Sequence, residues 1–278
     1  MDGAAETITE ILIPYTTEYM MMIIVAASLL VGMIGIIAWK MQSEGKLAPF
    51  FGGIFMYLVF TACLKSMCDL MIGPLFMGSP WAQGVYEGLF WTLLQLLGIY
   101  FGFTAVHKDH SDRRMSVTFG LGFGWTQLLT STLLSASMYY AFAISVNDIG
   151  IAEMTANYTE EEMASFNATL AYMQSLTTFD CVLSLLEVFV RVALLMAVSV
   201  IVFTAVKGVD TRKNLAVAAC LQFVSLTPMG WHQTGTGLPL WVAEVMMLLG
   251  MACAVIYAKR LYDELPVPRR YSRRTKYL

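Results

Sequence analysis

Seven long apolar runs, separated by short polar segments, account for most of the chain. The runs extend over Met20–Trp39, Pro49–Ile72, Val85–Val106, Met115–Val146, Phe179–Val206, Leu215–Thr227 and Leu240–Ala258. A helix needs about 20 apolar residues to cross the hydrocarbon core of a bilayer, and most of the runs reach that length. Leu215–Thr227 is the short one. The pattern predicts an all-α integral membrane protein, built as a bundle of about seven transmembrane helices.

The basic residues predict the orientation of this bundle. Apart from Lys65 and Arg191, every Lys and Arg follows the first, third, fifth or seventh run. Segments rich in Lys and Arg stay on the cytoplasmic side, so the N-terminus is expected outside and the C-terminus in the cytoplasm. The predicted parts are a short acidic outer segment (1–18), a seven-helix transmembrane domain (19–258) with an outer loop (147–178), and a basic cytoplasmic tail (259–278).

Composition limits the kind of activity that the chain can have. Of its 278 residues, 58% are hydrophobic and only 13% are charged, which leaves no room for a soluble catalytic domain. Any chemistry is therefore expected within or beside the bilayer. The polar, acidic start of the chain lacks the basic region of a signal peptide, so we expect the first span to be retained.

Two polar segments carry local structural signals. Thr159 followed by three glutamates is typical of a helix N-cap with acids in the first turn, and it predicts a short surface helix in the outer loop. The sequence Thr227-Pro-Met-Gly at the end of the sixth run predicts an unwound or re-entrant segment. Such backbone is tolerated at membrane depth only where protein or water surrounds it.

Ionisable side chains within the runs form a candidate intramembrane polar site. Its members are Lys65, Asp69, Glu187, Arg191 and Glu244. The first four form two pairs with a spacing of four residues, which places each pair on one helix face. Two interpretations stay open: ion pairs that satisfy each other, or a contact with a substrate, a proton or a partner. Glu244 has no partner nearby in sequence, and it would carry a proton or pair with Lys65 or Arg191.

Two further acids and the histidines complete the inventory. Glu87 and Asp180 lie near the outer ends of their runs, where we expect them to reach water. His107 and His110 have a spacing that could hold a metal, but no third ligand lies beside them. We therefore predict no metal site and no cofactor.

Three segments carry a resemblance to a known family. They are Gly88-Leu-Phe-Trp-Thr-Leu-Leu-Gln, Phe119-Gly-Leu-Gly-Phe-Gly-Trp-Thr-Gln and Ser199-Val-Ile-Val-Phe-Thr-Ala-Val. They resemble landmarks of the YhfC family of intramembrane metalloproteases, which is similar to PrsW and the CAAX-protease superfamily. The resemblance extends from about residue 50 to residue 228. It implies a helical membrane fold and a metal that assists peptide hydrolysis.

At the positions where the family carries its catalytic residues, this chain differs. The family has a glutamate pair, a histidine between glycines, a following glutamate and two later histidines. The residues of this chain at those positions are Trp91, Thr92, Phe123, Gln127, Met196 (or the adjacent Leu195) and Gln222. Metal-assisted hydrolysis needs ligands for the ion and a carboxylate to handle the proton of its water. The resemblance thus implies a degenerate, catalytically inactive member, in which Gly120, Gly122 and Gly124 persist because they allow close helix packing.

Three functions follow as hypotheses. The first is a non-catalytic intramembrane pseudoprotease that binds a membrane protein partner or a lipidic ligand. The alternative is a small transporter, or a membrane subunit of a transport complex, that uses the buried charges. The second alternative is an active YhfC-like metalloprotease. The expected surroundings are the lipid bilayer of a prokaryotic plasma membrane and another membrane protein, with no nucleic acid partner.

Overall fold

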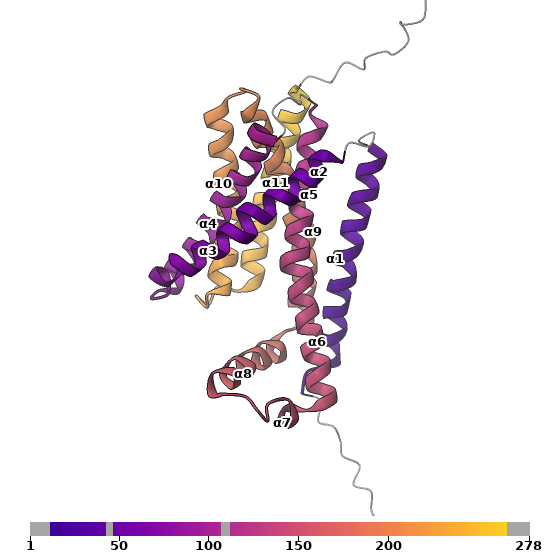
Figure 1. The fold of residues 1–278 in the computed structure, drawn as a ribbon, viewed down its shortest axis with the longest axis vertical. Helices are drawn as coiled ribbons and strands as arrows, with labels where there is room; N and C mark the ends of the chain where they lie inside the picture. Colours follow the sequence, from indigo (N-terminus) through magenta and orange to yellow (C-terminus); the bar gives the residue numbers. More distant parts are fainter. Residues whose placement is uncertain (1–11, 43–46, 107–111, 266–278) are drawn as a thin grey trace, which may run out of the picture. The chain divides into compact units, whose positions relative to one another are not determined.

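The computed structural model describes residues 12–42, 47–106 and 112–265, and within these ranges all regular structure is helical. In chain order (Figure 1), the helices are α1 (Tyr15–Gln42), α2 (Ala48–Met56), η1 (Tyr57–Cys63), α3 (Leu64–Met71), η2 (Gly73–Phe76), α4 (Pro80–Phe101), η3 (Gly102–Val106), α5 (Arg114–Gln127), η4 (Leu128–Leu133), α6 (Leu134–Ile149), α7 (Ile151–Met154), α8 (Glu160–Ser175), α9 (Thr178–Val206), α10 (Thr211–Gln233) and α11 (Leu240–Glu264). The prediction of an all-helical chain is confirmed.

Six of the seven apolar runs coincide with helices long and apolar enough to cross a membrane. In the described part of the chain these are Tyr15–Ile37, Ala48–Met71, Pro80–Val106, Arg114–Ile149, Thr178–Val206 and Leu240–Glu264. The short run lies in α10, which has 23 residues but is less apolar than the six. Most of the acidic N-terminal segment, the pair His107 and His110, and the basic tail from residue 266 onward lie outside the described residues.

The chain divides into two compact units. Unit 1 comprises Met1–Gly32 and Leu129–Val188, and unit 2 comprises Met33–Leu128 and Phe189–Leu278. Three long helical stretches, α1, α5 to α6, and α9, therefore continue from one unit into the other.

Unit 1 is held by an apolar core and by one buried amide. Its core includes Met21, Ile24, Phe166 and Met173. The Ile13 N–H donates to Asn147 Oδ1 at 3.0 Å, and Asn147 Nδ2 donates to the Ile13 carbonyl at 3.1 Å. The side chain thus satisfies both backbone groups of Ile13, which fixes the segment before α1 against α6.

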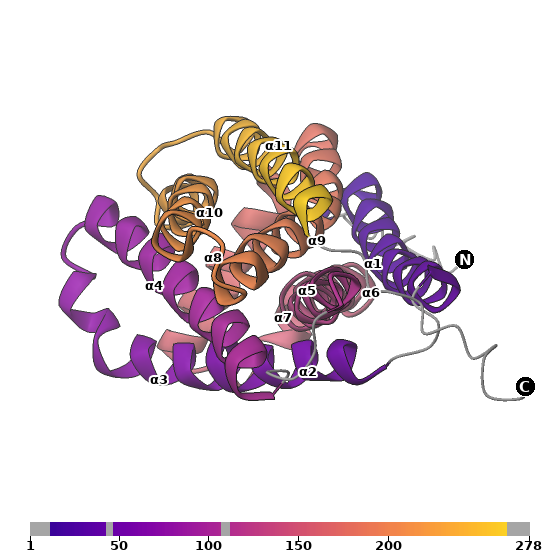
Figure 2. The same ribbon diagram turned by 90° about the horizontal axis from the view of Figure 1, so that it is seen from above.

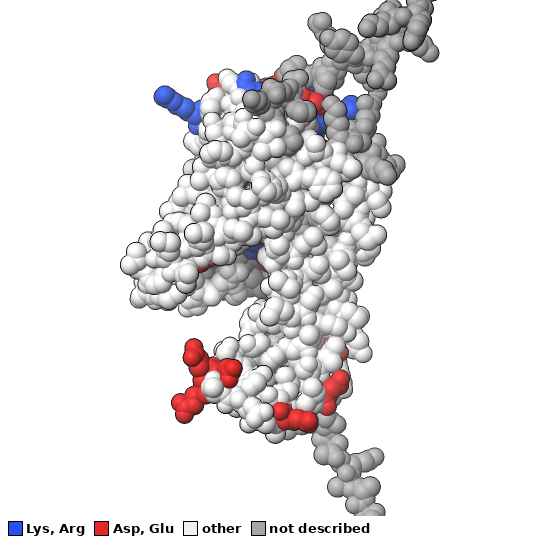
Figure 3. All heavy atoms as spheres, viewed as in Figure 1, with Lys and Arg blue, Asp and Glu red and all other residues white. Residues whose placement is uncertain are grey.

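The surface helix predicted in the outer loop is confirmed as α8. Thr159 is its N-cap, and a capping box joins Thr159 to Glu162 in both directions. The acidic side chains of this unit, which include Glu160 and Glu161, gather on the surface over α7 and α8 (Figure 3).

Unit 2 is organised around α10, which packs against α4 on one side and α11 on the other (Figure 2). Glycines allow α4 and α10 to approach closely. A Cβ added at Gly88 would lie 2.7 Å from Thr227 Cα, and one added at Gly230 would lie 2.7 Å from the Gly84 carbonyl oxygen. We call this contact the α4–α10 seam. Small residues bring helix backbones together in the same way in membrane proteins generally.

The three glycines of α5 make similar approaches, which confirms their predicted packing role. A Cβ at Gly120 would lie 2.7 Å from Ser199 Cβ of α9, and one at Gly122 would lie 2.9 Å from the Phe50 carbonyl carbon of α2. Gly124 faces Val192 of α9, at 3.3 Å. Beside these contacts, Phe123 is fully buried, and its ring lies 5.2 Å from that of Tyr57.

The prediction of an unwound segment at Thr227-Pro-Met-Gly is wrong, because α10 continues through Pro228 to Gln233. Proline removes one helix hydrogen bond, but packing overrides this cost here. Residues 226–230 are all buried, and Trp231 Nε1 donates to the Trp81 carbonyl at 3.1 Å. The α4–α10 seam therefore holds the end of α10 in helical form.

We expect Gly122→Ala to destabilise the protein by about 3 kcal/mol, because the added methyl would overlap the backbone of Phe50 and force α2 away from α5. Thermal unfolding in detergent or nanodiscs measures the effect. Gly78→Ala is the matched control, since a Cβ there would have nothing within 4 Å. Equal melting temperatures for the two variants would contradict the close approach of α2 and α5.

The capping box makes the start of α8 sensitive to acid. Hydrogen bonds from the Thr159 backbone N–H and hydroxyl lower the pKa of Glu162. Its stabilising contribution is therefore fully present above the ordinary pKa of a glutamate, and it is lost as the pH falls through the lowered value. Amide exchange in the first turn of α8, corrected for its intrinsic pH dependence, should accelerate over that range. In Glu162→Gln this acceleration should disappear, whereas Glu161→Gln should retain it.

Candidate functional site

Three glutamines from three helices meet inside unit 2. They are Gln95 of α4, Gln127 at the end of α5 and Gln222 of α10, with exposures of 1%, 2% and 0%. We call them the glutamine triad. Two of them, Gln127 and Gln222, were predicted from the family resemblance as former active-site positions, and the structure brings them together through Gln95.

Two hydrogen bonds link the three amides of the triad, and each runs from the Nε2 of one glutamine to the Oε1 of the next. Gln222 Nε2 donates to Gln95 Oε1, and Gln95 Nε2 donates to Gln127 Oε1 at 3.2 Å. The bonds connect α10 to α4 and α4 to α5. A neutral network of this kind holds three apolar helices in register without burying a charge.

The triad lies deep along its helices. The rings of Trp81 and Trp231 are 5.2 Å apart at one end of the α4–α10 seam, and tryptophan is typical of the membrane interface. At a rise of 1.5 Å per residue, Gln95 lies about 21 Å along α4 from Trp81, and Gln222 lies about 13 Å along α10 from Trp231. Both distances are shorter than the thickness of a hydrocarbon core, which is about 30 Å.

Three other residues at the former active-site positions lie on α4, α5 and α9. Thr92 is buried on α4, one turn before Gln95, while Phe123 is buried on α5 against Gly98 and Tyr57. Met196 of α9 lies beside Gly120. Gln95 was missed from the sequence, although its spacing of three residues from Thr92 would have placed both on one helix face.

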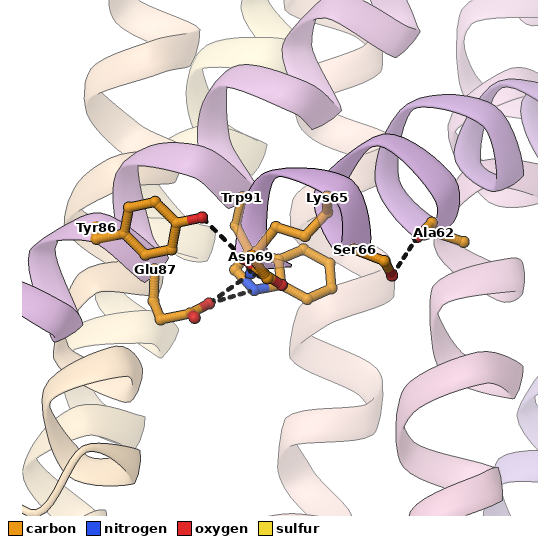
Figure 4. A network of polar contacts seen from close by, with 7 residues as sticks. All are labelled: Ala62, Lys65, Ser66, Asp69, Tyr86, Glu87 and Trp91. Carbon is orange, nitrogen blue, oxygen red and sulfur yellow. Dashed lines mark hydrogen bonds and ion pairs between the residues drawn. The ribbon is translucent and has the colours of Figure 1, made fainter. Parts of the chain in front are cut away.

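Trp91 belongs to a second polar site, which is formed by α3 and α4. This site, which we call the lysine cluster, contains Lys65 and Asp69 of α3 and Tyr86, Glu87 and Trp91 of α4 (Figure 4). Lys65 Nζ lies 2.7 Å from both Asp69 carboxylate oxygens and 2.8 Å from Glu87 Oε2. The predicted pairing of Lys65 with Asp69 is confirmed.

The aromatic residues of the lysine cluster bond to its two acids. The Tyr86 hydroxyl donates to Asp69 Oδ1 at 3.0 Å, and Trp91 Nε1 donates to Glu87 Oε2 at 3.1 Å. The Lys65 side chain is 7% exposed, while those of Asp69 and Glu87 are 41% and 26% exposed. One lysine side chain therefore faces two acidic side chains.

Glu87 was expected only to reach water, and its pairing with Lys65 was not predicted. The two residues lie on different helices, so no local spacing relates them.

The remaining members of the predicted intramembrane polar site lie elsewhere. Glu187 and Arg191 are one turn apart on α9, and Glu244 is 3% exposed near the start of α11. At the start of α9, the backbone N–H and the hydroxyl of Thr177 both donate to Asp180 Oδ2.

The residues of the triad do not fit a catalytic metal. Zinc takes thiolate, imidazole or carboxylate ligands, whereas the triad offers neutral amides that bond one another. Across the described ranges, no group of three or more His, Cys, Asp and Glu side chains could hold a metal ion.

A comparison with protein families places the chain. The family model described as YhfC intramembrane metalloprotease matches residues 27–247. The chain belongs to this family. The YhfC match spans both the glutamine triad and the lysine cluster. Comparisons with curated proteins and with solved structures gave no match.

We expect Lys65→Met to destabilise the protein by about 2 kcal/mol, because it leaves two carboxylates side by side without their ammonium. Removing one partner of a fully buried pair costs about 3–5 kcal/mol, and the partial exposure of both acids reduces this figure. The triple variant Lys65→Met/Asp69→Asn/Glu87→Gln should recover much of the loss.

Thermal unfolding again provides the measurement. Arg260→Met is the control, since its ion pair with Glu264 joins side chains that are 79% and 57% exposed. That change should leave the melting temperature nearly constant. A Lys65→Met protein as stable as the control would contradict the role assigned to the lysine cluster.

Proposed function

We propose that this YhfC-family chain is a non-catalytic pseudoprotease that binds a membrane protein partner or a lipidic ligand within its helical bundle. The observation that carries the proposal is the glutamine triad. Helices α4, α5 and α10 converge as an intramembrane active site requires, but the converging side chains are amides.

The chemistry of the triad argues against hydrolysis. An amide oxygen is a weak ligand for a divalent ion, and an amide cannot take a proton from a metal-bound water at neutral pH. Phe123 fills the space between Tyr57 and Gly98 with a ring in place of an ionisable group. The proposal takes Phe123, Gln127 and Gln222 as the residues at the positions of the family's metal ligands and catalytic carboxylate, as the resemblance implies.

The proposed topology has seven spans, with the N-terminus outside and the C-terminus in the cytoplasm. The seven spans are the six apolar helical segments described above and α10, which is less apolar than those six. Several polar residues of α10, including Asn214, Gln222 and Ser225, are buried within unit 2. A span that protein surrounds does not need a fully apolar sequence. The distribution of Lys and Arg supports the orientation and a location in the prokaryotic plasma membrane.

The lysine cluster favours the alternative of a small transporter or a subunit of one. Its acids are partly exposed at membrane depth and outnumber its ammonium. Such residues often mark ion or proton pathways. If Glu87→Gln, Arg191→Gln and Glu244→Gln all left the transport activity of the native assembly unchanged, this alternative would fail. The family match itself is the support for an active metalloprotease, the second alternative.

The direct test of the proposal is crosslinking and purification of the tagged chain from its native membranes. We expect a stoichiometric membrane protein or a defined lipid. Photo-crosslinkers on the exposed side chains Leu89 and Leu93 of α4 would report contacts beside the triad. Recovery of the chain alone, with every crosslinker position free of protein and lipid adducts, would overturn the proposal.

Zinc binding separates the pseudoprotease from the active enzyme. We expect the purified chain to hold far less than one zinc ion after dialysis against zinc, measured by mass spectrometry of the metal. Phe123→His/Gln127→Glu/Gln222→His should bind more, because it supplies imidazole and carboxylate ligands. One zinc ion per unmodified chain, lost in Gln222→Leu, would contradict the assignment.

A further inference from the structure

Three buried polar atoms of the α4–α10 seam have no hydrogen-bond partner among the residues that the structure describes. They are Thr92 Oγ1, Thr227 Oγ1 and Gln222 Oε1. Their residues are 3%, 3% and 0% exposed. Buried polar atoms without partners are rare in native proteins, and each costs several kilocalories per mole in a lipid environment. Three of them along one seam need an explanation.

Two helix contacts give the order of these three residues along the seam. Thr227 packs directly on Gly88, and Gln222 bonds Gln95. Thr92 lies between these two contacts on α4, about 6 Å along the helix axis from Gly88 and about 4.5 Å from Gln95. The spacings of four and three residues keep Gly88, Thr92 and Gln95 on one face of α4. Thr92 is therefore within about one turn of both α10 residues.

The chemistry of the seam defines its occupant. The three residues lie along the seam from the backbone contact at Gly88 to the amide bonds of the glutamine triad. Gln222 Oε1 accepts hydrogen bonds, while the two hydroxyls can donate or accept. A cation at this depth would lack a counter-charge among these three neutral atoms.

We propose that the α4–α10 seam binds an ordered water molecule that donates to Gln222 Oε1 and bonds the hydroxyl of Thr92, with Thr227 as a third partner. A buried water typically makes two to four such bonds, and the seam supplies three. The water completes the satisfaction of the glutamine triad. It adds a second link between α4 and α10 beside the direct bond from Gln222 to Gln95.

The sign of one stability change tests the water. If the Thr92 hydroxyl were dry and unpartnered, Thr92→Val would remove a buried polar atom and raise the melting temperature. If a water bridges the hydroxyl to Gln222, the same change leaves the water and Gln222 Oε1 with one hydrogen-bond partner fewer. The melting temperature should then fall by ~2–4 °C. In a Gln222→Met background the loss should shrink, because the partner of the water is already gone.

Thr204→Val is the matched control, since its buried hydroxyl donates to the Val200 carbonyl within α9. Its melting temperature should change less than that of Thr92→Val. Water-edited solid-state NMR of the full chain in nanodiscs gives a second measurement. Magnetisation should pass from water to the Gln222 amide and to Thr92 in the unmodified protein, and it should be lost at Gln222 in Thr92→Val.

Three results would overturn the proposal of a bound water. The first is a higher or unchanged melting temperature for Thr92→Val, and the second is the absence of water transfer to either residue. The third is a Gln222 signal that shifts when sodium chloride replaces choline chloride, which would identify a cation. None of these readouts depends on a partner or on zinc, so the proposed function and the bound water can fail separately.

Discussion

The close approach of α4 to α10 is the contact on which the rest of unit 2 depends. Polar side chains inside a membrane bundle have no solvent to bond, so they need partners in the protein. Glycines at positions 84, 88 and 230 bring the two backbones together, and this proximity lets Gln222 reach Gln95. The glycines of α5 act in the same way toward α2 and α9. Helix packing and polar satisfaction are therefore one problem, solved by small residues at the contacts and amides between them.

Helix α4 also separates two kinds of polar chemistry. Gln95 faces α10 and α5, and its amide joins those of Gln222 and Gln127 in a neutral network. Glu87 and Trp91 face α3, and they belong to a charged network that is partly open to its surroundings. A buried amide network suits a fixed structural or binding role, because its bonds do not change with pH. The partly exposed lysine cluster suits recognition of a charged group. Both roles are compatible with the proposed binding function.

Two π-helical segments, η1 and η4, lie next to these polar sites. Segment η1 ends one residue before α3, which carries Lys65, and η4 begins directly after Gln127. A π-helical turn shifts the side chains that follow it around the helix axis, and such turns are frequent at functional sites. Here η1 sets which face of α3 carries Lys65 and Asp69 toward α4. Because the backbone change lies next to the polar residues, their placement depends on more than the regular helical period.

The sequence by itself determined the helices, most of their limits, the pairing of Lys65 with Asp69 and the packing role of the α5 glycines. These features depend on local composition and on spacings of three or four residues, which the chain carries without its fold. Only the tertiary structure decided that Gln95 joins Gln127 to Gln222, that Glu87 completes the lysine cluster and that α10 stays helical through Pro228. Each of these depends on the approach of segments far apart in the sequence. No local period encodes the distance between α4 and α10, because that distance results from the packing of both helices within unit 2.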